Sequence, residues 1–342
     1  MIQQINHNEF LEKSDGIPVI DVRSPKEFLR GHIPDAINLP LFDDDERKNV
    51  GTLYKKSGKE ASLLLSLDIA GPKLSYFVKT ARKLSPDREI LIHCWRGGMR
   101  SASMAWLFET ADFKVFVLNG GYKAYRKYIR QKIGEEANLI VVGGKTGCGK
   151  SEILNYLAKA GEQVLDLENI AHHKGSAFGD LGQEKQPTNE QFENNLFQAW
   201  QKLDLNLPVW IEDESRGIGT VSIPEPLYNK IRQSPVIFLD VEKEIRITRL
   251  VKEYALFDPA LLEAAILRIN KKLGGLNTKL TIEALFNKDF NTAASILLTY
   301  YDKAYLKGLS MREQKKVFKL ELHKDNPALN TQLVVEYARK IL

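Results

Sequence analysis

One stretch decides the fold of the second half of this chain: Leu139-Ile140-Val141-Val142-Gly143-Gly144-Lys145-Thr146-Gly147-Cys148-Gly149-Lys150-Ser151. Its first four residues are a short apolar run, which predicts a buried strand. The residues from Ser151 to Leu157 have the apolar spacing of an amphipathic helix. The glycine-rich turn therefore lies between a strand and a helix, and we expect an α/β unit around it.

The turn matches the pattern Gly-x-x-x-x-Gly-Lys-Ser of phosphate-binding P-loops, in the strand-loop-helix context that the pattern requires. Glycines let backbone N–H groups face a phosphate, the lysine adds a positive charge, and the serine hydroxyl is suited to Mg²⁺. We expect Cys148 to be a small loop residue rather than a nucleophile. The predicted phosphate-binding residues of this loop are Gly144, Gly147, Gly149, Lys150 and Ser151.

Acidic residues follow the next predicted strand, Pro208-Val209-Trp210-Ile211, and read Glu212-Asp213-Glu214. In P-loop proteins an acidic residue at such a strand end orients a metal ion. Glu212 or Asp213 is therefore a candidate metal ligand, although these acids are equally consistent with solvated charges or partners of arginines. Further strands are predicted at 236–241 and 317–322, and the remaining pattern from Phe257 to Leu342 is mainly helical.

A second glycine-rich turn lies about fifty residues upstream and reads His93-Cys94-Trp95-Arg96-Gly97-Gly98-Met99-Arg100-Ser101. It follows a predicted strand at 89–92 and precedes a predicted helix at 101–108. Backbone N–H groups in such a turn, with a helix N-terminus behind them, bind tetrahedral anions and lower the pKa of a thiol. We therefore predict a reactive thiolate at Cys94, further catalytic residues at Arg96 and Arg100, and phosphate-binding glycines at Gly97 and Gly98.

Length and composition predict two domains, 1–134 and 135–342. The chain has 342 residues, of which 43% are hydrophobic, enough for two cores. Its two cysteines lie in separate loops, which argues against a disulfide framework and for a reducing cytoplasm. We find no apolar run of membrane-spanning length and no secretory leader, so the expected location is cytoplasmic, without membrane contact.

A basic segment at the domain junction combines Lys123, Arg126, Lys127, Arg130 and Lys132 with Tyr122, Tyr125 and Tyr128. Such a helix is suited to an RNA backbone and to stacking on unpaired bases. Tyrosines at three-residue spacing also pack against their own domain, and the sequence leaves both possibilities open.

Upstream segments complete a resemblance of the first half to the rhodanese family. They read Ile20-Asp21-Val22-Arg23-Ser24-Pro25-Lys26-Glu27-Phe28 and Gly31-His32-Ile33-Pro34-Asp35-Ala36-Ile37-Asn38. In that family the loop cysteine carries a persulfide or perselenide, or acts on an anion held by the loop. The cysteine loop also resembles that of the cysteine-dependent phosphatases, in which an arginine at the position of Arg100 binds two phosphate oxygens.

Over nearly its full length the chain resembles the tRNA 2-selenouridine synthases, a rhodanese domain fused to a P-loop domain. The matching segments include both loops, Leu118 to Tyr122, Leu167-Glu168, His173 to Gly179 and Glu212 to Arg216. The resemblance implies an α/β fold in both domains, with a mainly helical C-terminal region. It also implies a selenotransferase that converts wobble 2-thiouridine of tRNA to 2-selenouridine through an S-geranyl intermediate.

In this family's reaction, geranyl diphosphate and selenophosphate are substrates, Mg²⁺ is a possible cofactor, and none is permanently bound. The P-loop then holds the diphosphate and the rhodanese loop holds selenophosphate. Two alternatives come from other classes. One is a rhodanese-fold sulfurtransferase or phosphatase, and the other is a P-loop nucleotide-dependent kinase or ATPase.

Overall fold

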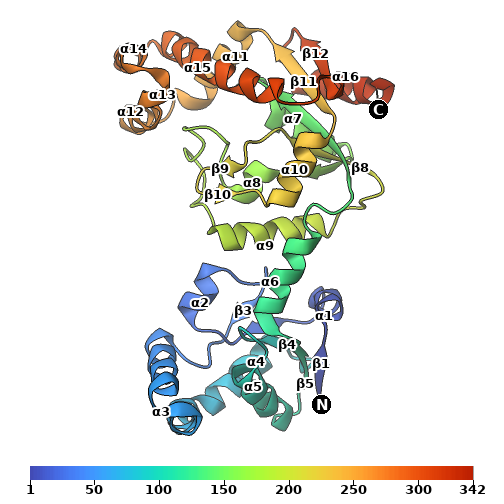
Figure 1. Ribbon diagram of the computed structural model, residues 1–342, viewed down its shortest axis with the longest axis vertical. Coiled ribbons are helices and arrows are strands. Elements are labelled where there is room, and N and C mark those ends of the chain that lie inside the picture. Colours follow the sequence, from blue (N-terminus) through green and yellow to red (C-terminus); the bar gives the residue numbers. More distant parts are fainter. Residues whose placement is uncertain (342) are drawn as a thin grey trace. The chain divides into compact units, whose positions relative to one another are not determined.

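A computed structural model describes residues 1–341, so Leu342, the last residue of the second predicted domain, lies outside the described residues. The chain divides into two compact units. The N-terminal unit contains residues 1–132 and 193–195, and the C-terminal unit contains residues 133–192 and 196–342. The predicted boundary at residue 134 falls between helix α6 and strand β6 (Figure 1).

The N-terminal unit is built on a five-stranded parallel sheet with the order β1-β5-β4-β2-β3. Apolar side chains of β2, β4 and β5 form its core with α4 and α5. The strands are β1 (Ile2–Ile5), β2 (Val19–Asp21), β3 (Ile37–Asn38), β4 (Glu89–His93) and β5 (Lys114–Leu118). The helices are α1 (His7–Ser14), α2 (Pro25–Arg30), α3 (Asp44–Ala70), the 3-10 turn η1 (Gly71–Lys73), α4 (Leu74–Leu84), α5 (Met99–Thr110) and α6 (Gly121–Lys132).

Local sequence explains where the helices of this unit begin. Asn6 caps α1, since its side chain accepts a hydrogen bond from the backbone N–H of Glu9 at 3.0 Å. Ser24 and Glu27 form a capping box at the start of α2, where Pro25 occupies the first turn. α3 is interrupted at Gly58, whose φ of +84° is outside the helical range.

The C-terminal unit is built on a second five-stranded parallel sheet with the order β12-β11-β6-β8-β7. The strand before the P-loop, β6 (Asn138–Gly144), is therefore central. The other strands are β7 (Gln163–Leu165), β8 (Pro208–Glu212), β11 (Val236–Val241) and β12 (Val317–Leu322), and a small antiparallel ribbon pairs β9 (Gly217–Ile218) with β10 (Val221–Ser222). The predicted strands at 236–241 and 317–322 are confirmed.

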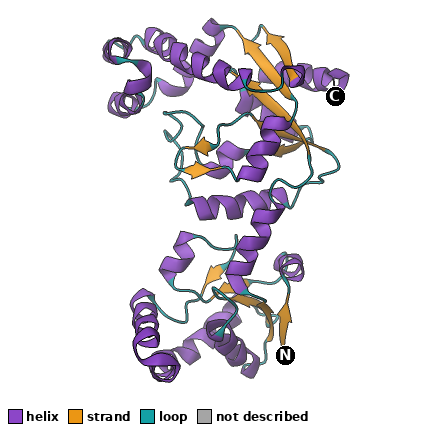
Figure 2. Cartoon of the chain, in the orientation of Figure 1, coloured by secondary structure: helices purple, strands orange, loops and turns teal. Residues whose placement is uncertain are grey.

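Helices surround this sheet and form a helical region beside it (Figure 2). Those near the sheet are α7 (Lys150–Lys159), α8 (Leu167–Ala171), α9 (Asn189–Trp200), α10 (Glu225–Gln233) and α16 (Pro327–Ile341). The helical region contains α11 (Lys243–Tyr254), α12 (Pro259–Arg268), α13 (Asn270–Leu273), α14 (Gly275–Phe286) and α15 (Phe290–Ser310), and the 3-10 turn η2 (Gln314–Lys316) follows it. The region has its own apolar cluster, which includes Leu262, Ile266 and Leu285.

Candidate active sites

The cysteine loop lies at the carboxyl end of β4, the central strand of the N-terminal sheet. Cys94 follows β4 directly, and α5 begins at Met99. The Cys94 Sγ lies 3.2 Å from the Ser101 Oγ, in the first turn of α5. The structure therefore places the thiol at the strand-to-helix turn that the sequence predicts.

The surroundings of Cys94 favour its ionised form. Burial alone raises the pKa of the thiol, but hydrogen bonds from the Ser101 hydroxyl and from the backbone N–H groups of Arg96 and Ser101 outweigh it, and the Arg100 charge adds to them. The net pKa is lowered, which agrees in direction with the predicted thiolate. For Cys148, by contrast, burial dominates and raises the pKa.

Glycines allow a second loop to pack closely on the cysteine loop. Gly97 and Gly121 have φ values of +65° and +59°, which favour glycine. A side chain on Gly121 would collide with the carbonyl of Cys94 and the backbone of Gly97. The backbone N–H of Tyr122 donates to the Cys94 carbonyl at 2.9 Å. The start of α6 thus fixes the shape of the cysteine loop.

The two arginines of the cysteine loop lie in different environments. Arg96 is exposed, whereas Arg100 is partly buried and binds Glu27 of α2. Arg100 Nη1 donates to Glu27 Oε2 at 2.6 Å, and Nη2 donates to Oε1 at 3.3 Å. The pair with Glu27 uses two of the five N–H donors of the guanidinium. Contact of Arg100 with a substrate stays a prediction.

The Asp-Val-Arg motif forms a buried ion pair. Arg23 Nη2 lies 2.6 Å from Asp21 Oδ2 and donates to the Gly31 carbonyl at 2.7 Å. The Arg23 guanidinium also lies 3.8 Å from the centre of the Tyr122 ring. Because Asp21 and Arg23 are both fully buried, this motif stabilises the interior of the N-terminal unit.

The P-loop has the backbone that phosphate binding requires. Gly147 and Gly149 have φ values of +81° and +90°, and Lys150 Nζ donates to the Gly144 carbonyl at 3.2 Å. Burial would lower the pKa of Lys150, but the Cys148 thiol and three carboxylates, Glu214, Glu168 and Glu212, raise it. The Lys150 ammonium therefore stays charged. An ammonium at this position neutralises a bound phosphate.

Three carboxylates form a cluster beside Ser151, and we call Glu168, Glu212 and Glu214 the carboxylate cluster. Oxygen atoms of these residues lie within 4.8 Å of one another. Ser151 Oγ donates to Glu168 Oε2 at 2.9 Å, and the Glu168 N–H donates to Glu212 Oε1 at 2.8 Å. Glu212 Oε2 is buried without a hydrogen-bond partner among the described residues. Burial, and then the Glu168 charge, raise the pKa of Glu214 to about 8.

The structure distinguishes between the two candidate metal ligands. Glu212 belongs to the carboxylate cluster, whereas Asp213 lies outside it. Asp213 Oδ1 lies 2.5 Å from Arg312 Nη2, and its Oδ2 accepts a hydrogen bond from the Tyr305 hydroxyl at 3.0 Å. Both carboxylate oxygens of Asp213 thus have a protein partner, an arginine and a tyrosine, and its role as a metal ligand stays a prediction. The same Tyr305 hydroxyl accepts a hydrogen bond from Gly144 N–H at 2.8 Å, so Asp213 supports the P-loop.

Sequence reasoning did not assign roles to Glu168, Glu214 or Tyr305. Glu168 precedes β8 by about forty residues, and Tyr305 lies in α15. Only Glu214 had a local signal, since it alternates with Glu212 after a strand. The other two come to the loop through tertiary folding, which a reading along the chain does not show.

The tyrosines of the basic segment face into their own unit. Tyr122 and Tyr125 are 0% and 1% exposed, and the ring of Tyr128 lies 4.0 Å from that of His7. Of the two possibilities left open, packing within the domain is confirmed for Tyr122 and Tyr125. Neither ring is available to stack on an RNA base.

No helix within residues 1–341 has both the length and the apolar character to cross a membrane.

These features define the class of protein: a rhodanese-like unit with a cysteine loop, joined to a P-loop unit with a carboxylate cluster. Family models agree, since residues 6–128 match the rhodanese-like domain and residues 137–333 match the tRNA 2-selenouridine synthase AAA domain. The chain belongs to the tRNA 2-selenouridine synthase family, a family of tRNA-modifying enzymes. The predicted fold class and family are thus confirmed.

Similar proteins match along most of the chain. The tRNA 2-selenouridine synthase of Bdellovibrio bacteriovorus is 35% identical, over 89% of this chain and 92% of its own length. That of Psychromonas ingrahamii is 32% identical, over 93% and 94%. That of Pseudomonas fluorescens is 31% identical, over 94% of each chain. These matches therefore extend over both units of the chain.

Proposed function

We propose that this enzyme replaces the sulfur of wobble 2-thiouridine in tRNA by selenium in two steps, at two different loops. The P-loop unit transfers a geranyl group from geranyl diphosphate to the sulfur. The cysteine loop then delivers selenium from selenophosphate. One observation carries the proposal: the reactive groups of the two loops differ. A thiol with a lowered pKa lies in one loop, and an ammonium beside a carboxylate cluster lies in the other.

In the first step, the sulfur on C2 of the base attacks the allylic carbon of geranyl diphosphate. A sulfur–carbon bond forms, the carbon–oxygen bond breaks, and diphosphate leaves with the electron pair. The base loses the proton on its ring nitrogen. Lys150 and the N–H groups of the P-loop neutralise the charge that develops on the leaving oxygen.

The residues beside the P-loop fit a divalent cation. Within residues 1–341, Glu212 Oε2 is buried without a hydrogen-bond partner, and three carboxylates share a small volume with the Ser151 hydroxyl. Oxygen ligands of this kind suit Mg²⁺, which Ser151 and the carboxylate cluster would hold. Bound there, Mg²⁺ would add positive charge beside the leaving diphosphate. Ionisation of Glu214, whose pKa is raised to about 8, is also favoured by such a charge.

In the second step, selenium of selenophosphate adds to C2 of the S-geranyl base. The carbon–sulfur bond then breaks, geranylthiol leaves, and water takes the phosphoryl group as phosphate. The N–H groups of the cysteine loop and the exposed Arg96 bind the selenophosphate oxygens. Cys94 supports this step by helping to hold the donor in the loop, which needs no change in the oxidation state of selenium.

Nucleoside mass spectrometry of tRNA containing 2-thiouridine tests the proposal. The full chain is incubated first with geranyl diphosphate and then with selenophosphate. We expect a geranyl mass gain in the first incubation and 2-selenouridine in the second. Direct selenation without geranyl diphosphate would contradict the S-geranyl route. No change in either incubation, together with hydrolysis of ATP or of a phosphate ester, would favour an ATPase or a phosphatase.

A further inference from the structure

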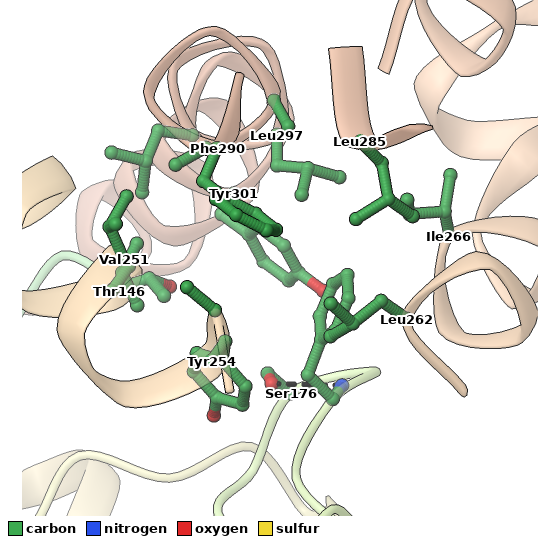
Figure 3. A pocket seen from close by; sticks show the side chains of 16 residues that line it. Thr146, Ser176, Val251, Tyr254, Leu262, Ile266, Leu285, Phe290, Leu297 and Tyr301 are labelled. Carbon is green, nitrogen blue, oxygen red and sulfur yellow. Dashed lines mark hydrogen bonds between the residues drawn. The ribbon is translucent and has the colours of Figure 1, made fainter. Parts of the chain in front are cut away.

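An apolar cavity lies beside the P-loop in the C-terminal unit (Figure 3). It encloses about 650 Å³ of space, including its open mouth, between α11, α12, α14 and α15. Of the residues that the structure describes, none with a charged side chain lines it. The reaction proposed above assigns no residue to this cavity.

One end of the cavity meets the phosphate site. Thr146 of the P-loop lines it, and Leu250, which also lines it, packs on the P-loop glycine Gly147. Ser176 lines the same end and directly follows Gly175, where an added Cβ would lie 2.7 Å from Glu214 Oε2. The cavity therefore begins next to both the P-loop and the carboxylate cluster.

The hydroxyl groups that line the cavity also lie toward this end. Tyr301 accepts a hydrogen bond from the backbone N–H of Ala177 at 3.3 Å, beside Ser176. Burial raises the pKa of Tyr254, and the charges of Glu253 and Glu168 raise it further, so Tyr254 lies within electrostatic range of the carboxylate cluster. The cavity thus has a polar end toward the P-loop.

The other walls are hydrocarbon. Leu262 and Ile266 of α12 and Leu285 of α14 are at most 4% exposed and belong to the core of the helical region. Figure 3 shows these side chains together with Leu297 of α15 around the cavity. A purine would leave its ring nitrogens unpaired against such walls, which costs free energy. A branched hydrocarbon chain has no polar atoms to leave unpaired there, and its transfer out of water is favourable.

We infer that this cavity binds the isoprenoid tail of the allylic diphosphate and sets the length of tail that the enzyme accepts. The inference rests on the proposed function, since the P-loop must hold the diphosphate for the tail to enter beside Thr146. The tail enters past Thr146 and Ser176 and ends against Leu262, Ile266 and Leu285.

Each buried methylene group strengthens binding about fourfold. Geranyl diphosphate, with five more carbons than dimethylallyl diphosphate, is therefore expected to bind up to about 1,000-fold more tightly. Filling the cavity removes this difference. The substitution Ala294→Phe adds a ring where α15 lines the cavity. The matched control is Ala304→Phe, which adds the same ring at an exposed position of α15.

Calorimetric titration of the full chain with geranyl, dimethylallyl and inorganic diphosphate tests the inference. Ala294→Phe is expected to lose most of the preference for geranyl diphosphate while keeping its affinity for inorganic diphosphate. Ala304→Phe keeps both. If Ala294→Phe keeps the preference for geranyl diphosphate, the inference is overturned. A further titration with ATP tests the other occupant: if Ala294→Phe loses ATP binding but keeps the geranyl preference, the cavity is a nucleotide site.

A gain of activity provides the second test, which misfolding does not imitate. Leu285→Ala enlarges the far end, so farnesyl diphosphate should become a donor in transfer to 2-thiouridine tRNA. If the wild type transfers geranyl and Leu285→Ala still rejects farnesyl diphosphate, the tail site is wrong and the proposed function stands. If tail preference depends on the cavity but no tRNA is geranylated, the proposed function fails and the tail site stands.

Discussion

The thiol pKa values of Cys94 and Cys148 are shifted in opposite directions, because the surroundings of the two side chains differ. Both are buried. Cys94 receives hydrogen bonds from a hydroxyl and from backbone N–H groups that stabilise the thiolate, whereas burial dominates at Cys148. The position of a cysteine in a glycine-rich loop is therefore not enough to make it reactive. Hydrogen bonds to the sulfur determine whether the thiolate is stabilised.

The pH dependence of Cys94 follows from this. Its pKa lies below the ordinary value of 9.0, so the thiolate forms at lower pH than in a free thiol. Ser101→Ala removes the strongest hydrogen bond that stabilises the thiolate. The midpoint of the Cys94 thiol titration should therefore move to higher pH. The ultraviolet thiolate absorbance of the wild type minus that of Cys94→Ser, measured against pH, reports the midpoint. An unchanged midpoint in Ser101→Ala would contradict the assigned cause.

Arg23 provides a stability prediction. Arg23→Ala leaves Asp21 buried without its cation, which typically costs about 3–5 kcal/mol of unfolding free energy. Urea unfolding of the full chain should show the transition of the N-terminal unit at lower denaturant concentration. Arg88→Ala is the control, because its ion pair with Asp112 is exposed and is worth at most about 1 kcal/mol. Equal effects of the two substitutions would refute a structural role for the buried pair.

The cysteine loop after β4 packs directly against the start of α6, so a change in one displaces the other. Gly121 is close enough to the Cys94 carbonyl that a methyl group does not fit, and its φ of +59° disfavours other residues. Gly121→Ala should therefore displace the cysteine loop and slow selenium insertion at least tenfold, while geranyl transfer remains.

Nucleoside mass spectrometry of the two half-reactions checks this expectation. Gly71→Ala serves as the control, since a side chain on Gly71 meets no atom within 4 Å. Equal loss of both half-reactions in Gly121→Ala would mean that the substitution unfolds the chain rather than displacing one loop.

Elements with strong local patterns could be predicted from the sequence, and those defined by pairing could not. The strand-loop-helix segments around Cys94 and Gly144 were predicted because apolar runs flank glycines. Strands β3 and β7 contain two and three residues, too few for a period to be visible, and neighbouring strands define them. The same distinction applies to the candidate site. Each loop is a contiguous segment that can be found in the sequence, whereas Glu168 and Tyr305 reach the P-loop only in the folded chain.

Residues 1–341 contain two five-stranded parallel sheets, and in each a glycine-rich loop that is predicted to bind an anion follows the central strand. Both loops lie at the carboxyl ends of parallel strands, which is where α/β proteins bind ligands. We assign one half-reaction to each loop. Damage to one loop is therefore expected to spare the chemistry of the other.

The most direct test supplies the intermediate and bypasses the first half-reaction. Lys150→Ala and Cys94→Ser are each given two substrates, 2-thiouridine tRNA and tRNA that already carries S-geranyl-2-thiouridine, and nucleosides are measured by mass spectrometry. We predict that Lys150→Ala fails to geranylate the first tRNA but, given selenophosphate, converts the second to 2-selenouridine. Cys94→Ser should accumulate the geranylated base and lose most of the second conversion. If both variants lose both conversions equally, the two loops do not divide the reaction and the account is wrong.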